Sequence, residues 1–172
     1  KSSYAVLGEL TMLEKLLRDG RKVSWTGVKS ATHDLELDDC SIEVKSTLKR
    51  YGYEVSISSA YQLAPTDKPL YLAFFRFEES SLGRSVEDVV KSLKGLGYDE
   101  IALEKELTTA GLPKGRTARN EKYKLLESKR YTVDETFPSI TLESFKGDKI
   151  PEKIVAFTYT VDLSGVEGSS LL

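Results

Sequence analysis

Two acidic residues and a lysine, Asp34, Glu43 and Lys45, are spaced nine and two residues apart along the chain. The segments around them, residues 33–37 and 40–47, alternate apolar and polar residues, which is typical of strands with one buried face. In a strand, residues two apart share a face, so Glu43 and Lys45 point the same way. The pattern therefore predicts two neighbouring strands whose acids and amine lie on one side.

The turn between these strands leaves two registers open. A two-residue turn at Asp38-Asp39 sets Asp34 opposite Glu43, whereas a turn one residue later sets Asp34 opposite Lys45. Both registers keep the acids on one face, because an intermediate pairing would turn Asp34 toward the core.

Carboxylates that face each other on a sheet repel and need a compensating cation. Lys45 can neutralise one charge, but Asp34, Glu36 and Glu43 leave an excess of negative charge. A bound Mg²⁺ would balance it, because this ion prefers oxygen ligands completed by water and phosphate oxygens, and Mn²⁺ is expected to substitute. Such an ion can polarise a phosphodiester and activate water, while Lys45 orients that water or stabilises the developing charge. A charged, exposed hairpin is the alternative.

A Glu-x-Lys triplet alone is a weak signal, and the chain contains a second copy at Glu127-Ser128-Lys129. The nearest aspartate before that copy is Asp99, twenty-eight residues upstream. Only the first copy has the expected spacing from an upstream acid, and only the first copy lies in a predicted hairpin.

An amphipathic helix is expected before the strands, over residues 5–18, ended by Asp19-Gly20. Glu9 lies on its apolar stripe. Its neighbours three and four residues away are Ala5, Val6, Met12 and Leu13. A carboxylate there is costly unless a charge meets it. Glu9 therefore either pairs with a lysine or arginine or reaches the metal site, and we favour the second. Glu14, four residues before Arg18, is expected to form a surface ion pair.

The remaining elements suggest a mixed sheet flanked by helices. Further strands are expected over residues 22–25, 53–58, 70–77, 123–133 and 154–163, and helices over 59–63, 86–93 and 100–107. The near-continuous apolar run at 70–77 is typical of a central strand buried on both faces. This order predicts an α/β fold of mixed α+β character, with one domain over residues 1–172.

The bulk composition is ordinary for a soluble protein of 172 residues, with 40% hydrophobic and 30% charged residues. No apolar run is long enough for a membrane span, so we expect no membrane partner and a cytoplasmic location. The single cysteine, Cys40, excludes an internal disulfide, and with one histidine it excludes a Cys/His zinc site. Because the chain begins with lysine rather than methionine, we expect an upstream segment to be missing.

Positive charge is concentrated between residues 113 and 130, which contain seven basic and two acidic residues. The net charge of the chain is −2, so this segment carries +5 and the rest −7. A phosphate contact and a solvated lysine-rich loop explain this distribution equally well.

Several short motifs follow one another along the chain. They are Gly8-Glu9-Leu10, Trp25-x-Gly27, His33-Asp34, Glu43-Val44-Lys45-Ser46-Thr47 and Ser58-Ser59-x-x-Gln62-Leu63. This succession resembles the PD-(D/E)xK nucleases, in particular a bacterial group often found beside restriction-modification and phage-defence genes. The resemblance implies a restriction-endonuclease-like core over about residues 3–80, followed by a C-terminal extension over about 82–172.

The resemblance also implies roles for individual residues. Asp34 and Glu43 would be metal ligands together with Val44, Lys45 the catalytic lysine and Glu9 an accessory acid and ligand. Candidate substrate contacts are Gln62, Ser46, Thr47 and Ser59, and in the basic segment Lys114, Arg116 and Arg119. His33 replaces the family's proline and is expected to be a local hydrogen-bonding residue rather than a base.

The function that follows is a Mg²⁺-dependent endodeoxyribonuclease in restriction or phage defence, with DNA as its partner. Cutting both strands requires two sites, so a homodimer or a restriction-modification partner subunit is expected. Two alternatives stay open. One is a catalytically silent DNA-binding or scaffolding module, and the other is a repair or junction-resolving nuclease.

Overall fold

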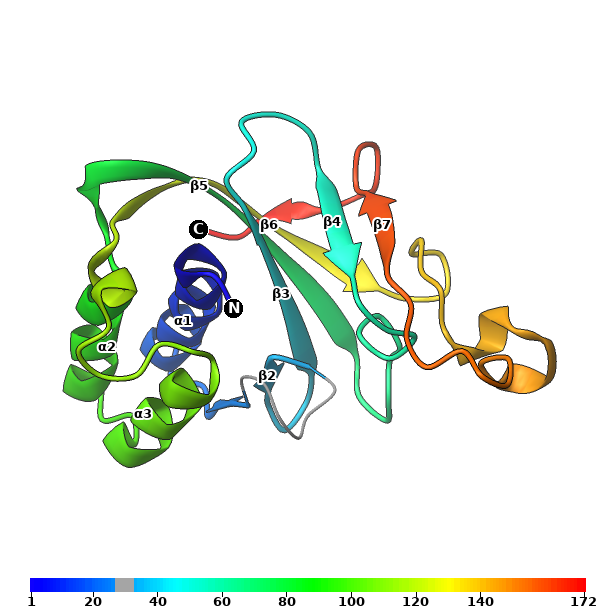
Figure 1. Ribbon diagram of the computed structural model, residues 1–172, viewed down its shortest axis with the longest axis horizontal. Helices are drawn as coiled ribbons and strands as arrows, with labels where there is room; N and C mark the ends of the chain where they lie inside the picture. The colour runs from blue at the N-terminus through cyan, green and yellow to red at the C-terminus, as the bar shows by residue number, and fades with distance from the viewer. Residues whose placement is uncertain (27–32) are drawn as a thin grey trace.

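The computed structural model describes residues 1–26 and 33–172 (Figure 1). Within these residues a six-stranded sheet has the strand order β1-β2-β3-β5-β6-β8. Its strands are Ser24–Trp25 (β1), Leu35–Glu36 (β2), Ser41–Thr47 (β3), Leu70–Arg84 (β5), Tyr123–Val133 (β6) and Ser169–Ser170 (β8). β3 and β5 run parallel and the other neighbours antiparallel, so the predicted mixed sheet is confirmed.

Different elements cover the two faces of this sheet. Figure 1 shows the helices Ser3–Arg18 (α1), Val86–Gly95 (α2) and Glu100–Thr109 (α3) gathered on one side. On the other side lies a two-stranded antiparallel sheet of Glu54–Ile57 (β4) and Tyr159–Asp162 (β7). Short 3-10 turns occur at Thr117–Asn120, Leu142–Ser144 and Lys146–Asp148. None of the helices in the described part of the chain combines the length and apolar character needed to cross a membrane.

β5 contributes to the core on both faces of the sheet. Ala73 and Phe75 pack into the cluster formed with α1 and α2, while Leu72 and Phe74 pack into the cluster formed with β4 and β7. Because side chains alternate along a strand, a strand covered on both faces must be apolar at successive positions. The prediction of a central strand here is confirmed, although β5 continues to Arg84 rather than ending near residue 77.

A glycine allows α1 to approach β3 closely. A Cβ atom placed on Gly8 would lie 2.0 Å from Ser46 Oγ on β3. A side chain at this position would therefore push the helix away from the strand. The next residue is Glu9, so the same approach carries this carboxylate to the sheet.

The predicted helix at residues 59–63 is absent from the structure, where the segment forms bends and turns. Ser59 Oγ accepts a hydrogen bond from the Tyr61 N–H at 3.1 Å, and Gln62 Oε1 accepts one from the Ser58 N–H at 2.9 Å. These side chains satisfy backbone donors locally, which replaces the helical bonds.

Candidate active site

The turn between β2 and β3 settles the register. Leu35 lies opposite Ile42, and the Leu37 N–H donates to the Cys40 carbonyl at 2.9 Å. A two-residue turn at Asp38-Asp39 therefore joins the strands, as in the first of the two predicted registers.

Asp34 lies immediately before β2, at the edge of β3. Among the described residues, β2 pairs with β3 only at Ser41 and Ile42, and none of the described strands pairs with the next part of this edge. Asp34 Oδ2 accepts a hydrogen bond from the Val44 N–H at 2.8 Å. Since the N–H and C=O of one strand residue point to the same edge, the Val44 carbonyl also faces this side.

Glu43 and Lys45 lie on β3 and are in contact with each other. Lys45 Nζ is 3.1 Å from Glu43 Oε1, and it donates to Gln62 Oε1 at 3.2 Å. The Ser58 N–H donates to the same Gln62 oxygen, which ties the amide to the backbone after β4. Gln62 thus positions the Lys45 amine.

Glu9 reaches the same region from α1. Its Oε2 accepts a hydrogen bond from Trp25 Nε1 at 2.6 Å, and its Oε1 accepts one from Lys1 Nζ at 2.5 Å. The Lys1 amine also donates to Asp34 Oδ1 at 3.0 Å. Of the two predicted outcomes for Glu9, the pairing with a lysine is present, and the same lysine joins it to Asp34. That Glu9 reaches a metal ion stays a prediction.

The three acids are short of positive charge. Burial and the negative charge of Asp34 raise the pKa of Glu9 to about 7, although Lys1 and Trp25 act in the opposite direction. Burial and Asp34 also raise the pKa of Glu43 to about 8, with Lys45 opposing. Burial alone would lower the pKa of Lys1, but the charges of Asp34 and Glu9 raise it above its ordinary value. These mutual effects place the three carboxylates in one electrostatic cluster.

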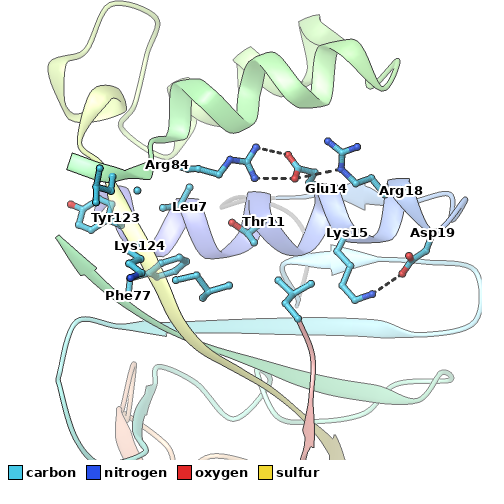
Figure 2. A pocket seen from close by; sticks show the side chains of 14 residues that line it. Leu7, Thr11, Glu14, Lys15, Arg18, Asp19, Phe77, Arg84, Tyr123 and Lys124 are labelled. Carbon is cyan, nitrogen blue, oxygen red and sulfur yellow. Dashed lines mark hydrogen bonds and ion pairs between the residues drawn. The ribbon is translucent and has the colours of Figure 1, made fainter. Parts of the chain in front are cut away.

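A second buried glutamate on α1 provides a comparison. Glu14 borders a cavity of about 420 Å³ between α1 and the antiparallel pair β5 and β6 (Figure 2). The Arg84 guanidinium donates to both Glu14 oxygens at 3.0 and 2.8 Å, and Arg18 lies 3.6 Å away. Hydrogen bonds from Arg84 lower the pKa of Glu14. The predicted pair with Arg18 is present but secondary to Arg84, and Glu14, unlike Glu9, has two half-exposed arginines beside it.

The oxygen donors at the edge of β3 suit a divalent metal ion. Asp34, Glu43 and the Val44 carbonyl offer the hard oxygen ligands that Mg²⁺ prefers, and the excess negative charge favours a cation. In the described part of the chain, no three His, Cys, Asp or Glu side chains converge closely enough to form a ready-made metal site. Two carboxylates, a carbonyl and water would therefore have to complete the coordination.

The hydroxyl groups predicted to bind substrate have local roles. Thr47 Oγ1 accepts a hydrogen bond from the Lys49 N–H at 3.0 Å, and Ser59 Oγ supports the turn described above. Ser46 Oγ is buried and faces Gly8, with no hydrogen-bond partner among the described residues. His33 is also buried, and its Nδ1 lies 3.6 Å from Glu36 Oε1, too far for the hydrogen bond expected of it. Of the family motifs, Gly27 lies outside the described residues.

The basic segment divides into exposed and buried residues. Lys114 and Arg116 are exposed. Arg119 is only 1% exposed, and its guanidinium pairs with Glu87 at 2.8 Å and Glu104 at 2.7 Å. The predicted phosphate contact of Arg119 is therefore corrected, because its charge is already neutralised inside the protein.

A mixed sheet that presents Asp34 beside Glu43-x-Lys45 defines the PD-(D/E)xK class. The family described as "Putative PD-(D/E)XK family member, (DUF4420)" matches residues 6–164, and the chain belongs to this family. The resemblance drawn from the sequence motifs, and the restriction-endonuclease-like fold that it implied, are confirmed. None of the curated proteins and none of the solved structures matches the chain. Membership indicates a nuclease-like protein of the hydrolase class.

Proposed function

We propose that the protein is a metal-dependent endodeoxyribonuclease that hydrolyses DNA phosphodiester bonds. One observation carries the proposal. Asp34 is bonded to the Val44 N–H at 2.8 Å, next to Glu43 on β3, and Lys45 Nζ lies 3.1 Å from Glu43. Burial and the charge of Asp34 raise the pKa of Glu43 despite this lysine. Two under-neutralised acids beside one lysine are the groups that metal-assisted hydrolysis needs.

Asp34, Glu43 and the Val44 carbonyl would hold Mg²⁺ or Mn²⁺. The bound ion would polarise the phosphodiester and lower the pKa of a water molecule. Glu9 adds a further carboxylate to the cluster through its shared contact with Lys1.

Lys45 acts on the substrate in this proposal. Its amine is held by Gln62 at 3.2 Å and by Glu43 at 3.1 Å, which limits its side-chain freedom before substrate arrives. A positioned ammonium group stabilises the negative charge that develops on the phosphate oxygens, or orients the attacking water. We expect Gln62, which is bound to the same amine, to contact the phosphate as well.

We assign the DNA backbone contacts to exposed basic residues in the segment that follows α3. The Lys1 backbone amine donates to the Ala110 carbonyl at 3.1 Å, so the segment that follows α3 starts near the acids. Lys114 and Arg116 lie in this segment and are exposed. Such contacts add affinity without reading the base sequence. Cleavage of both strands would require a homodimer or a partner subunit, in a restriction or phage-defence setting in the cytoplasm.

The test is nicking of supercoiled plasmid in Mg²⁺ or Mn²⁺. Asp34→Asn and Lys45→Gln should each reduce the rate by about 100-fold or more, as the loss of a charged catalytic group does elsewhere. Lys129→Gln, in the second Glu-x-Lys triplet, is the matched control and should keep the wild-type rate. Circular dichroism would verify that all three variants fold.

Other outcomes would favour the alternatives. DNA binding by the wild type without nicking in any divalent metal would contradict the proposal and support a silent binding or scaffolding module. Cleavage confined to branched DNA would support a repair or junction-resolving nuclease with the same chemistry.

A further inference from the structure

In both Glu9 and Asp34, one carboxylate oxygen accepts a hydrogen bond from a donor in the sheet, and the other oxygen contacts a lysine side chain. Glu9 Oε2 accepts from the Trp25 indole at 2.6 Å, and Asp34 Oδ2 accepts from the Val44 amide at 2.8 Å. Both donors belong to the sheet. The two remaining oxygens, Glu9 Oε1 and Asp34 Oδ1, both receive the Lys1 ammonium, at 2.5 and 3.0 Å.

Lys1 thus lies where a cation would bridge these two acids. Oδ1 is the Asp34 oxygen that has no backbone N–H bound to it, so it is the oxygen best placed to bind a metal ion, and it is the one that Lys1 contacts. Two cations do not share such a position, because they repel at short range.

We propose that Lys1 is a positioning residue that serves as a built-in counter-ion, holding Glu9 and Asp34 in place and yielding Asp34 to the divalent metal. This inference rests on the proposed function for its metal, and it adds that metal binding requires Lys1 to leave.

The surroundings of Lys1 allow this displacement. Its side chain is 30% exposed, compared with 3% for Glu9 and 10% for Asp34. Its backbone amine is held by Ala110, and α1 begins two residues later, so the main chain stays in place. The flexible four-carbon stem can rotate while the main chain stays in place, and the ammonium can then enter solvent or meet a substrate phosphate.

Lys45 does not take over this role. Its amine contacts Glu43 at 3.1 Å and Gln62 at 3.2 Å. Removal of Lys1 therefore leaves Glu9 and Asp34 without the cation that they share.

Mn²⁺ binding to the metal-free protein, followed by electron paramagnetic resonance, tests the inference without DNA. Lys1→Met should bind Mn²⁺ about tenfold more tightly than the wild type, because the competing charge is gone. Lys1→Arg should restore weak binding, since it restores the cation. Lys15→Met is the matched control. It removes an ion pair with Asp19 at 2.9 Å on the same helix and should leave Mn²⁺ affinity unchanged.

A second readout is thermal unfolding. Without metal, Lys1→Met should melt below the wild type, and saturating Mn²⁺ should remove the difference. If Lys1→Met does not fold without metal, Lys1→Gln, which keeps a hydrogen-bond donor, answers the same question.

Mn²⁺ affinity that is equal or weaker in a folded Lys1 variant would overturn the inference, as would the absence of Mn²⁺ binding in both proteins. A different result would contradict the proposed nuclease function. A wild type that never nicks DNA, but whose Mn²⁺ affinity rises on loss of Lys1, would refute nuclease activity and leave the counter-ion role standing.

Discussion

Replacing Glu43 with glutamine should stabilise the metal-free protein at alkaline pH while destroying its metal site. Burial and the charge of Asp34 raise the pKa of Glu43 from 4.5 to about 8. A raised pKa means that the folded state holds the proton more tightly than the unfolded state. Between pH 4.5 and about 8, the contribution of Glu43 to the free energy of unfolding therefore falls as pH rises, and above pH 8 the full cost is present.

The size of this cost follows from the shift. A rise from 4.5 to about 8 corresponds to at most about 5 kcal/mol, at about 1.4 kcal/mol per unit of pKa. Glutamine removes the buried charge, but it also leaves Lys45 without its partner at 3.1 Å. We therefore expect Glu43→Gln to gain about 2–3 kcal/mol over the wild type above pH 8, and little at pH 4.

Urea unfolding measures the difference in the free energy of unfolding between Glu43→Gln and the wild type. The measurement is made with a metal chelator present, at several pH values between about 4 and 9. Glu36→Gln on β2 is the matched control, because hydrogen bonds from Lys68 and Ser41 outweigh partial burial and lower the pKa of Glu36. Its loss should destabilise the protein at neutral pH and have least effect in acid. The reasoning would be refuted if the wild-type and Glu43→Gln curves stayed parallel across the whole pH range. Added Mg²⁺ should stabilise only the wild type, since an ion beside Glu43 offsets its charge.

Two further predictions follow from the DNA contacts and the helix packing. Replacing Lys114 and Arg116 with glutamine should weaken DNA binding and reduce the slope of log affinity against log salt by about 2, as measured by fluorescence anisotropy. Arg119→Met should leave that slope unchanged and cost about 3 kcal/mol of stability in urea, because it strands two partly buried acids. Gly8→Leu should destabilise the fold by at least about 2 kcal/mol, because its side chain would collide with Ser46 and lift α1 from β3. Mn²⁺ affinity should fall with it.

Elements with strong local patterns were predictable from the sequence. β3 and β6 lie within the strand ranges expected at 40–47 and 123–133, and α1 ends at Arg18 before Asp19-Gly20, as predicted. The far end of β5 was not predictable, because residues 78–84 are polar and become a strand by pairing with β6. That pairing is a tertiary interaction, which local patterning does not encode.

The candidate site divides in the same way. The spacing of Asp34, Glu43 and Lys45 predicts that they lie close together in one hairpin, so their shared location could be inferred from the sequence. Lys1 and Trp25 were missed as partners of the acids. Lys1 precedes the helix and follows no periodic pattern, and Trp25 looks like an ordinary packing residue. Their contacts arise only when α1 folds onto the sheet, so no spacing rule relates them to the acids.

The shortness of β2 explains why negative charge accumulates at this edge. If β2 had begun before Leu35 and stayed paired with β3, a backbone carbonyl could have accepted the Val44 N–H. Asp34 would then have been one more strand residue. Because the pairing stops at Ile42, the Asp34 carboxylate accepts the Val44 N–H in place of a backbone carbonyl, and its charge comes close to Glu43 and Glu9. A neutral acceptor at the same place would satisfy the amide equally well and leave both glutamates easier to ionise. The repulsion among these carboxylates therefore destabilises the fold at this edge, and a bound cation is the simplest way to offset it.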